Sequence, residues 1–224
     1  MTFAIVATDV ATGEMGVAIA TARPAVGALS PHAVPGVGVV ATQAIVNPQL
    51  AITALEDLAK GADAPTALRQ ALASDPEADL RQLLVADAKG EAAVFTGTKV
   101  GGWAGGVTGR GFAVGGNLLV GGEVISTMAA TFAGSTGHLA DRLLAALAAA
   151  DSTGGDRRGR QSAAILVVAE KPWPSLNLRV DDHVTPVREL QRLMVIWREY
   201  WEPFKLTGKF PPANPPGPPP RDIG

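Results

Sequence analysis

The stretch that decides the fold is residues 2–21, TFAIVATDVATGEMGVAIAT. It contains two apolar runs, residues 3–8 and 16–21, on either side of a turn-rich segment at residues 9–14. Two such runs separated by a short turn are typical of a β-hairpin. The runs are almost continuously apolar instead of alternating, which indicates strands that are covered on both faces.

Further strands and helices follow along the chain. Asn47-Pro48 predicts a helix start, with Asn as the N-cap and Pro at the first helical position, and Asp63 caps a second helix. Lys89-Gly90 joins another pair of apolar runs in a hairpin. The expected strands are 3–8, 16–21, 36–42, 83–86, 92–95, 163–169 and 176–180, with a Gly-rich strand and loop region at 101–116. The expected helices are a pair within 48–73, then 123–132, 139–150 and one that starts at Thr185-Pro186.

Hairpins produce antiparallel sheets, and helices between hairpins are typical of a layered α+β domain. We therefore expect a four-layer αββα sandwich, with two antiparallel sheets face to face and helices outside. Strands 3–7, 17–20 and 37–41 are expected to be neighbours, flanked by the helix pair. Pro dominates residues 210–224, so we predict a domain at 1–206 and a Pro-rich tail at 207–224.

Composition argues against several classes of function. The formal net charge is −2, and Lys and Arg form no long basic run, which argues against nucleic-acid binding. No stretch reaches the roughly 18 apolar residues of a membrane span, and the N-terminus lacks the basic region of a signal peptide. We therefore expect a cytoplasmic protein with no membrane partner. The sequence has no Cys, which excludes disulfides and Cys-ligated metals.

The three histidines, His32, His138 and His183, are scattered and form no pair at a spacing typical of metal ligands. Asp181-Asp182 precedes His183, but acidic residues before a helix start are explained by the helix dipole. No Gly-x-Ser-x-Gly motif supports a serine triad. The sequence therefore predicts neither a metal site nor a serine hydrolase.

Thr2 is the first candidate for catalysis. A small residue after Met1 normally allows methionine aminopeptidase to remove that Met, so that the mature chain begins at Thr2. Its hydroxyl is then a potential nucleophile and its own α-amine the base that activates it. An α-amine titrates near neutral pH, which leaves a neutral fraction for this task. The alternative is that the chain begins Met-Thr without any catalytic reason.

Residues 114–117, Val-Gly-Gly-Asn, are expected to form a turn after a strand. Backbone N–H groups of such a turn, together with the Asn117 side chain, can form an oxyanion hole. The alternative is that Gly115 and Gly116 simply permit a tight turn. The segment is not a phosphate-binding loop, because no Lys-Ser/Thr follows it.

Polar residues at the ends of other apolar runs are candidates for substrate contacts. Residues 154–163, GGDRRGRQSA, form the densest polar cluster and run directly into a strand. Such a loop can present Arg and Asp to an anionic or amide substrate, since the guanidinium group is a planar fork of donors. A solvated turn is the alternative. Thr42-Gln43 can face a pocket, whereas Asn47 is better explained as a helix cap.

With these residues in view, the chain resembles a bacterial family of domains of unknown function, family 1028 (DUF1028), which is grouped with the N-terminal nucleophile (Ntn) hydrolases. The resemblance spans roughly residues 2–195 and is most specific in GDRRGRQSA at 155–163. It is carried by residues 2–7, 16–20, 25–28, 38–44, 47–48, 115–117, 154–164 and 178–183.

The resemblance implies an αββα sandwich with Thr2 at the start of a central strand, and an amidohydrolase that cleaves a C–N bond of the amide or ureide type in a small or medium substrate. It implies no metal or organic cofactor, and a homo-oligomer with Trp197, Tyr200 and Trp201 as a possible contact. The implied catalytic residues are Thr2, Asn117 and Gly116, and the implied substrate-binding residues are Arg23, Gln43, Asp156, Arg158 and Gln161. The alternative is a non-catalytic binding or assembly protein that retains the sandwich.

Overall fold

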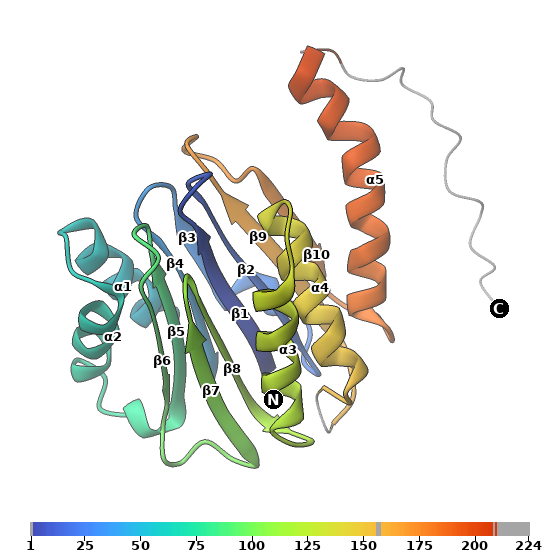
Figure 1. Cartoon of the computed structure of the whole chain (residues 1–224). Coiled ribbons are helices and arrows are strands. Elements are labelled where there is room, and N and C mark those ends of the chain that lie inside the picture. The colour runs from blue at the N-terminus through green and yellow to red at the C-terminus, as the bar shows by residue number, and fades with distance from the viewer. Residues whose placement is uncertain (1, 156–157, 208, 210–224) are drawn as a thin grey trace. The chain divides into compact units, whose positions relative to one another are not determined.

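The first two strands, β1 (Thr2–Asp9) and β2 (Glu14–Thr21), form the hairpin expected from residues 2–21. The computed structural model describes residues 2–155, 158–207 and 209 (Figure 1). These described residues form two antiparallel β-sheets and five α-helices. The mixture of helices with antiparallel hairpins confirms the broad expectation of an α+β fold.

β1 and β2 lie in the middle of a six-stranded antiparallel sheet, the first sheet. The strand order is β10-β9-β2-β1-β8-β7. The remaining strands are β7 (Trp103–Gly109), β8 (Phe112–Leu119), β9 (Ser162–Val168) and β10 (Leu176–Val180). β1 pairs with β2 on one side and with β8 on the other. Thr2, the first residue of β1, therefore lies on a central strand.

The second sheet has the order β3-β4-β5-β6. Its strands are β3 (Pro31–Val34), β4 (Gly38–Ala44), β5 (Arg81–Asp87) and β6 (Ala92–Thr96). The expected strand at 36–42 is thus β4, which packs against β1 and β2 from the facing sheet, so the three strands are neighbours as predicted although they belong to different sheets. Sequence analysis also missed β3, whose Pro31 is tolerated because it opens an edge strand and its missing N–H costs no essential ladder bond.

Two pairs of helices cover the sheets. α1 (Pro48–Ala59) and α2 (Ala64–Ala73) pack on the second sheet, and α3 (Glu123–Gly134) and α4 (Leu139–Ser152) pack on the first. The expected caps of the first pair are confirmed. The side chain of Asn47 accepts the N–H of Gln49 at 3.1 Å, and that of Asp63 accepts the N–H of Thr66 at 2.8 Å.

α5 (Pro186–Thr207) begins in one compact unit, which ends at Leu190, and continues into a second unit, which begins at Gln191. The first unit holds both sheets and α1 to α4. The predicted division between residues 206 and 207 stays a prediction, and residues 210–224 of the expected Pro-rich tail lie outside the described residues. None of the helices in the described part of the chain combines the length and apolarity needed to cross a membrane.

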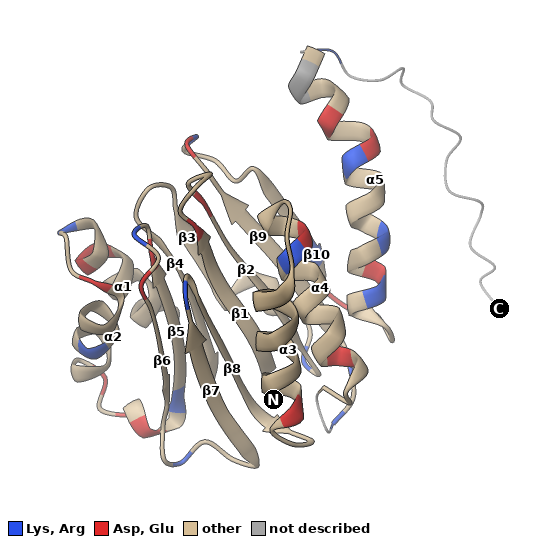
Figure 2. Ribbon diagram, viewed as in Figure 1, with Lys and Arg blue, Asp and Glu red and all other residues tan. Residues whose placement is uncertain are grey.

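The two sheets pack face to face through alternate residues of their strands. Ala4 and Val6 of β1 belong to the same buried cluster as Val39 and Ala41 of β4. In Figure 2 the strands are almost entirely tan, and the charged residues lie mainly on helices, loops and strand ends. Side chains two residues apart on a strand share a face. Thr2 therefore points into the end of the gap between the sheets.

The expected turn at residues 114–117 is wrong, because these residues lie inside β8. In this strand the two glycines allow neighbouring side chains to pack directly against the backbone. A Cβ on Gly115 would lie 3.0 Å from Leu84 of the facing sheet, and one on Gly116 would lie 2.7 Å from Leu119. A Cβ at Gly116 would force Leu119 to move, and one at Gly115 would fit only if Leu84 shifted slightly.

Candidate functional site

A row of polar side chains crosses one end of the first sheet; we call it the first polar row. Thr2 pairs with Thr21 on β2 and with Asn117 on β8, and Thr21 pairs with Ser162 on β9. Directly paired residues of antiparallel strands have their side chains on one face of the sheet. All four are buried, and the hydroxyl oxygens of Thr2 and Thr21 are hydrogen-bonded at 3.1 Å.

A second polar row lies opposite, on the other sheet. It consists of Gln43, Gln82 and Thr96, which are successive register partners across β4, β5 and β6. Gln82 connects the two rows, because its Oε1 accepts hydrogen bonds from Asn117 Nδ2 at 2.9 Å and from Gln43 Nε2 at 2.7 Å. Thr96 Oγ1 accepts from Gln82 Nε2 at 2.8 Å. The apolar core between the sheets thus ends in a hydrogen-bonded polar layer.

Backbone carbonyls fix the orientation of the Gln82 amide. Its Nε2 also donates to the carbonyl oxygens of Gly105 at 3.1 Å and Gly116 at 2.9 Å, which can only accept, so its two hydrogens are shared among three acceptors. Gln82 Oε1 must therefore face its two donors, and Asn117 must turn Nδ2 toward Gln82. One of the two hydrogens on Asn117 Nδ2 remains for another acceptor. Gln43 Oε1, by contrast, is buried without a hydrogen-bond partner among the described residues.

The first polar row borders a cavity of about 520 Å³, which is lined by Thr2, Thr21 and Asn117. Cavities of roughly 300–1,000 Å³ are typical of small-molecule sites. Most of the remaining lining is apolar and comes from the segments around residues 24–29, 44–46 and 100–101. The cavity therefore has hydroxyl and amide groups where it meets the first polar row, and mainly apolar walls on its other sides.

Backbone strain is concentrated at this cavity. Among the described residues, Ala25, Ala44 and Leu118 are the non-glycine residues with positive φ, at 54°, 70° and 54°, and all three line the cavity. Such conformations cost roughly 1–3 kcal/mol each and persist where the surrounding structure imposes them, often at functional sites. Their convergence singles out this cavity as the candidate site.

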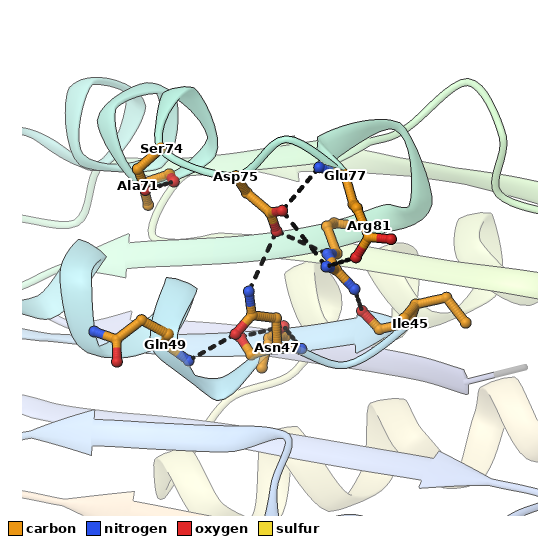
Figure 3. Close-up of polar contacts among 9 residues, drawn as sticks. Ile45, Asn47, Gln49, Ala71, Ser74, Asp75, Glu77 and Arg81 are labelled. Atoms are coloured by element: carbon orange, nitrogen blue, oxygen red, sulfur yellow. Dashed lines mark hydrogen bonds and ion pairs between the residues drawn. The ribbon is translucent and has the colours of Figure 1, made fainter.

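A buried ion pair between Arg81 and Asp75 lies behind one wall of the cavity, and Figure 3 shows its polar contacts. Arg81 Nε donates to Asp75 Oδ2 at 2.8 Å, and the two side chains are only 6% and 5% exposed. Arg81 Nη1 donates to the backbone carbonyl of Ile45, a lining residue, at 3.0 Å. The hydrogen bond from Arg81 is the main cause that holds the pKa of the Asp75 carboxyl below its usual value, with help from the N–H of Glu77 and the amide of Asn47.

The structure brings together two of the three residues implied as catalytic. Thr2 and Asn117 are register partners and both line the cavity. Gly116 does not line it, because a side chain there would point toward Ile125 of α3. Its backbone lies in the ladder between Phe3 and Gly105.

Of the implied substrate-binding residues, Arg23 and Arg158 line the cavity. Gln43 is fully buried in the second polar row, and Gln161 donates its side-chain N–H to a neighbouring carboxylate at 3.2 Å; neither belongs to the lining. Asp156 lies outside the described residues. No group of three or more His, Cys, Asp or Glu is arranged as a metal site in the part of the chain that is described.

Sequence analysis missed Thr21, Gln82 and Lys99. The hairpin register could have revealed Thr21, because a turn centred in 9–14 places residue 21 opposite Thr2. Gln82 and Lys99 carried no local signal. The first reaches Asn117 from the other sheet, and the second lies on the segment after β6 that lines the cavity.

Comparisons with known proteins point to one family. A family model described as a family of unknown function, DUF1028, matches residues 2–190. The crystal structure of a protein from Silicibacter pomeroyi, itself assigned to DUF1028, is similar with a TM-score of 0.82 and 32% sequence identity. The similarity covers 88% of this chain and 89% of that one. A comparison with curated proteins found no match.

Proposed function

The chain belongs to the DUF1028 family, whose function is unknown, and we propose that it is an N-terminal threonine amidohydrolase of the Ntn type. The observation that carries this proposal is the position of Thr2, which lines the cavity beside Asn117 and is hydrogen-bonded to Thr21. The packing of α1 and α2 on one sheet and of α3 and α4 on the other supports the αββα architecture. The proposed substrate is a small or medium molecule with a C–N bond of the amide or ureide type.

In the proposed reaction, removal of Met1 exposes the α-amine of Thr2. The amine takes the proton of the Thr2 hydroxyl as Oγ1 attacks the substrate carbonyl carbon. The resulting ammonium group then gives this proton to the leaving nitrogen as the C–N bond breaks. The same amine next activates a water molecule, which hydrolyses the acyl ester on Oγ1 and returns a proton to it. Each turnover therefore converts one amide and one water into an acid and an amine.

Asn117 is the proposed donor to the oxyanion that forms during both attacks. Gln82 Oε1 occupies one hydrogen of Asn117 Nδ2 and orients the amide, and the second hydrogen is assigned to the oxyanion. A donor that is already oriented stabilises the developing charge without the cost of reorganisation. Arg23 and Arg158 keep their proposed role in binding the substrate.

Processing of the N-terminus tests the proposal directly. We expect the intact mass of active protein to correspond to a chain that begins at Thr2. Insertion of a Lys between Met1 and Thr2 should retain Met1, because the aminopeptidase requires a small second residue. The hydroxyl remains but the α-amine is lost, so hydrolysis of amides, ureides and acyl-amino acids should disappear. Full activity in a chain that keeps Met1 would rule out the N-terminal mechanism and favour a different nucleophile.

Asn117→Ala should lower kcat by about a hundredfold or more, since it removes one oxyanion donor. The fold should persist, because Gln82 Oε1 still accepts from Gln43. Asn177→Ala, an exposed Asn on β10, is the matched control and should leave kcat unchanged. Steady-state kinetics and thermal unfolding are measured on all three proteins. An unchanged kcat together with a lower melting temperature would mean that Asn117 has only a structural role.

A further inference from the structure

The charged residues among the described lining of the cavity are all cationic, whereas the whole chain has a negative formal charge. Arg23, Lys99 and Arg158 line the cavity, and no Asp or Glu is among its described lining residues. The formal net charge of the chain is nevertheless −2. A cavity lined by charges of one sign focuses the field and concentrates ligands of the opposite sign.

Surface ion pairs do little to neutralise two of these residues, Arg23 and Lys99. Among the residues that the structure describes, Arg23 forms no ion pair, and Lys99 is 3.4 Å from Asp79 with side chains 69% and 50% exposed. An exposed pair of this kind is weak, because water and salt screen it. An arriving anion can therefore interact with both cationic groups.

Apolar side chains lie at the same cavity although they are open to water. Leu29, Ile45 and Val46 all line it and are 57%, 56% and 38% exposed. Exposed apolar residues that gather around a cavity mark a place for an apolar ligand group. The cavity therefore offers three different surfaces to one ligand: cationic groups, apolar side chains, and the hydroxyl and amide groups of the first polar row.

We propose that the ligand is an anionic amide, with an apolar body against Leu29, Ile45 and Val46 and a carboxylate held by Arg23 and Lys99. Arg23 provides a planar fork that fits a carboxylate, and Lys99 provides a point charge. The assignment of this ligand as a substrate rests on the proposed function. The selectivity for an anion does not depend on the proposed function, because binding measurements alone can detect it.

Two matched probes test this selectivity, N-hexanoylglycine and its neutral analogue N-hexanoylglycinamide. Calorimetric titration uses the Thr2→Ala protein, so that neither probe is turned over. The acid should bind about tenfold more tightly than the amide or better, as expected for charge-assisted hydrogen bonds. The preference should shrink as salt concentration rises, because the cations are exposed.

Arg23→Gln and Lys99→Met should each weaken binding of the acid by roughly fivefold, the effect of one unit charge at about 4 Å in water. Neither should change binding of the neutral amide. Lys60→Met is a close control for Lys99→Met, because Lys60 is 72% exposed and pairs with a single Asp at 3.2 Å, but lies outside the lining. Arg69→Gln, on the surface of α2, is the control for Arg23→Gln.

Equal affinity for both probes, or binding of neither at millimolar concentration, would overturn the proposed ligand class. Hydrolysis assays of the wild-type protein with the same probes separate this inference from the proposed function. Selective binding without hydrolysis leaves the anion site standing and contradicts the amidohydrolase. Equal hydrolysis of both probes supports the amidohydrolase and contradicts the anion site.

Discussion

Thr2→Ala is expected to abolish amide hydrolysis while the protein remains folded. Loss of a catalytic nucleophile typically lowers kcat by a factor on the order of 10⁴ or more. The substitution removes one hydroxyl and one methyl group. Thr21, the partner of the hydroxyl, lines the same cavity, where water can replace the lost hydrogen bond. The stability cost should therefore be only about 1–2 kcal/mol. Single-turnover kinetics and urea unfolding measure the two effects separately.

Thr2→Ser is the informative companion, because the chain still begins with an α-amine and a hydroxyl. It should retain part of the activity, whereas Thr2→Ala should retain none. Thr108→Ala, an exposed Thr on β7 of the same sheet, serves as the control and should match the wild-type protein. Activity of Thr2→Ala at the wild-type level would remove Thr2 from the mechanism and leave a binding or assembly protein as the better interpretation.

Arg81→Ala is expected to destabilise the fold by about 3–5 kcal/mol. The substitution leaves the Asp75 carboxylate buried without its cationic partner, since the Asp75 side chain is 5% exposed. It also removes the donor to the Ile45 carbonyl in the cavity wall. Lys99→Ala breaks an exposed pair and should cost less than about 1 kcal/mol. Urea unfolding followed by circular dichroism measures both variants.

The double variant Arg81→Met, Asp75→Leu shows whether the instability of Arg81→Ala comes from the loss of charge pairing or from the loss of packing. Replacing both partners leaves no buried charge, so it should recover much of the stability that Arg81→Ala loses. A double variant that is less stable than the single one would indicate that packing around Arg81, not charge, carries the effect.

Lowering the pH should reduce the difference in unfolding free energy between the wild-type protein and Arg81→Ala. The pKa of Asp75 is lowered in the folded wild-type protein, chiefly by the hydrogen bond from Arg81. A carboxyl with a lowered folded-state pKa adds stability above its unfolded pKa and loses it as pH falls through the folded value. The pKa values of Asp63 and Asp79 are also lowered, but both groups remain in the variant. Glu77 also pairs with Arg81, at 2.7 Å, but its side chain is 59% exposed and such a pair is weak, so the narrowing is expected to come mainly from Asp75. A constant difference from pH 7 to pH 3 would contradict this assignment.

The sequence alone determined the local structure of this protein. The β1–β2 hairpin and the caps at Asn47 and Asp63 follow from residues within a few positions of one another. Turns and helix caps depend on residues this close together, so they can be recognised from a short stretch of sequence. The choice of Thr2 as a candidate also needed only the first two residues and the chemistry of a hydroxyl beside an amine.

Tertiary structure alone decided which residues meet Thr2. Asn117 comes beside it because β8 pairs with β1, and Gln82 reaches Asn117 from the facing sheet. The glycines before Asn117 indicated a turn, but they reflect close packing against Leu84 and Leu119. Strand order and the pairing of sheets depend on contacts between segments far apart in sequence. A local pattern cannot encode them, because the same apolar strand can pair with several partners.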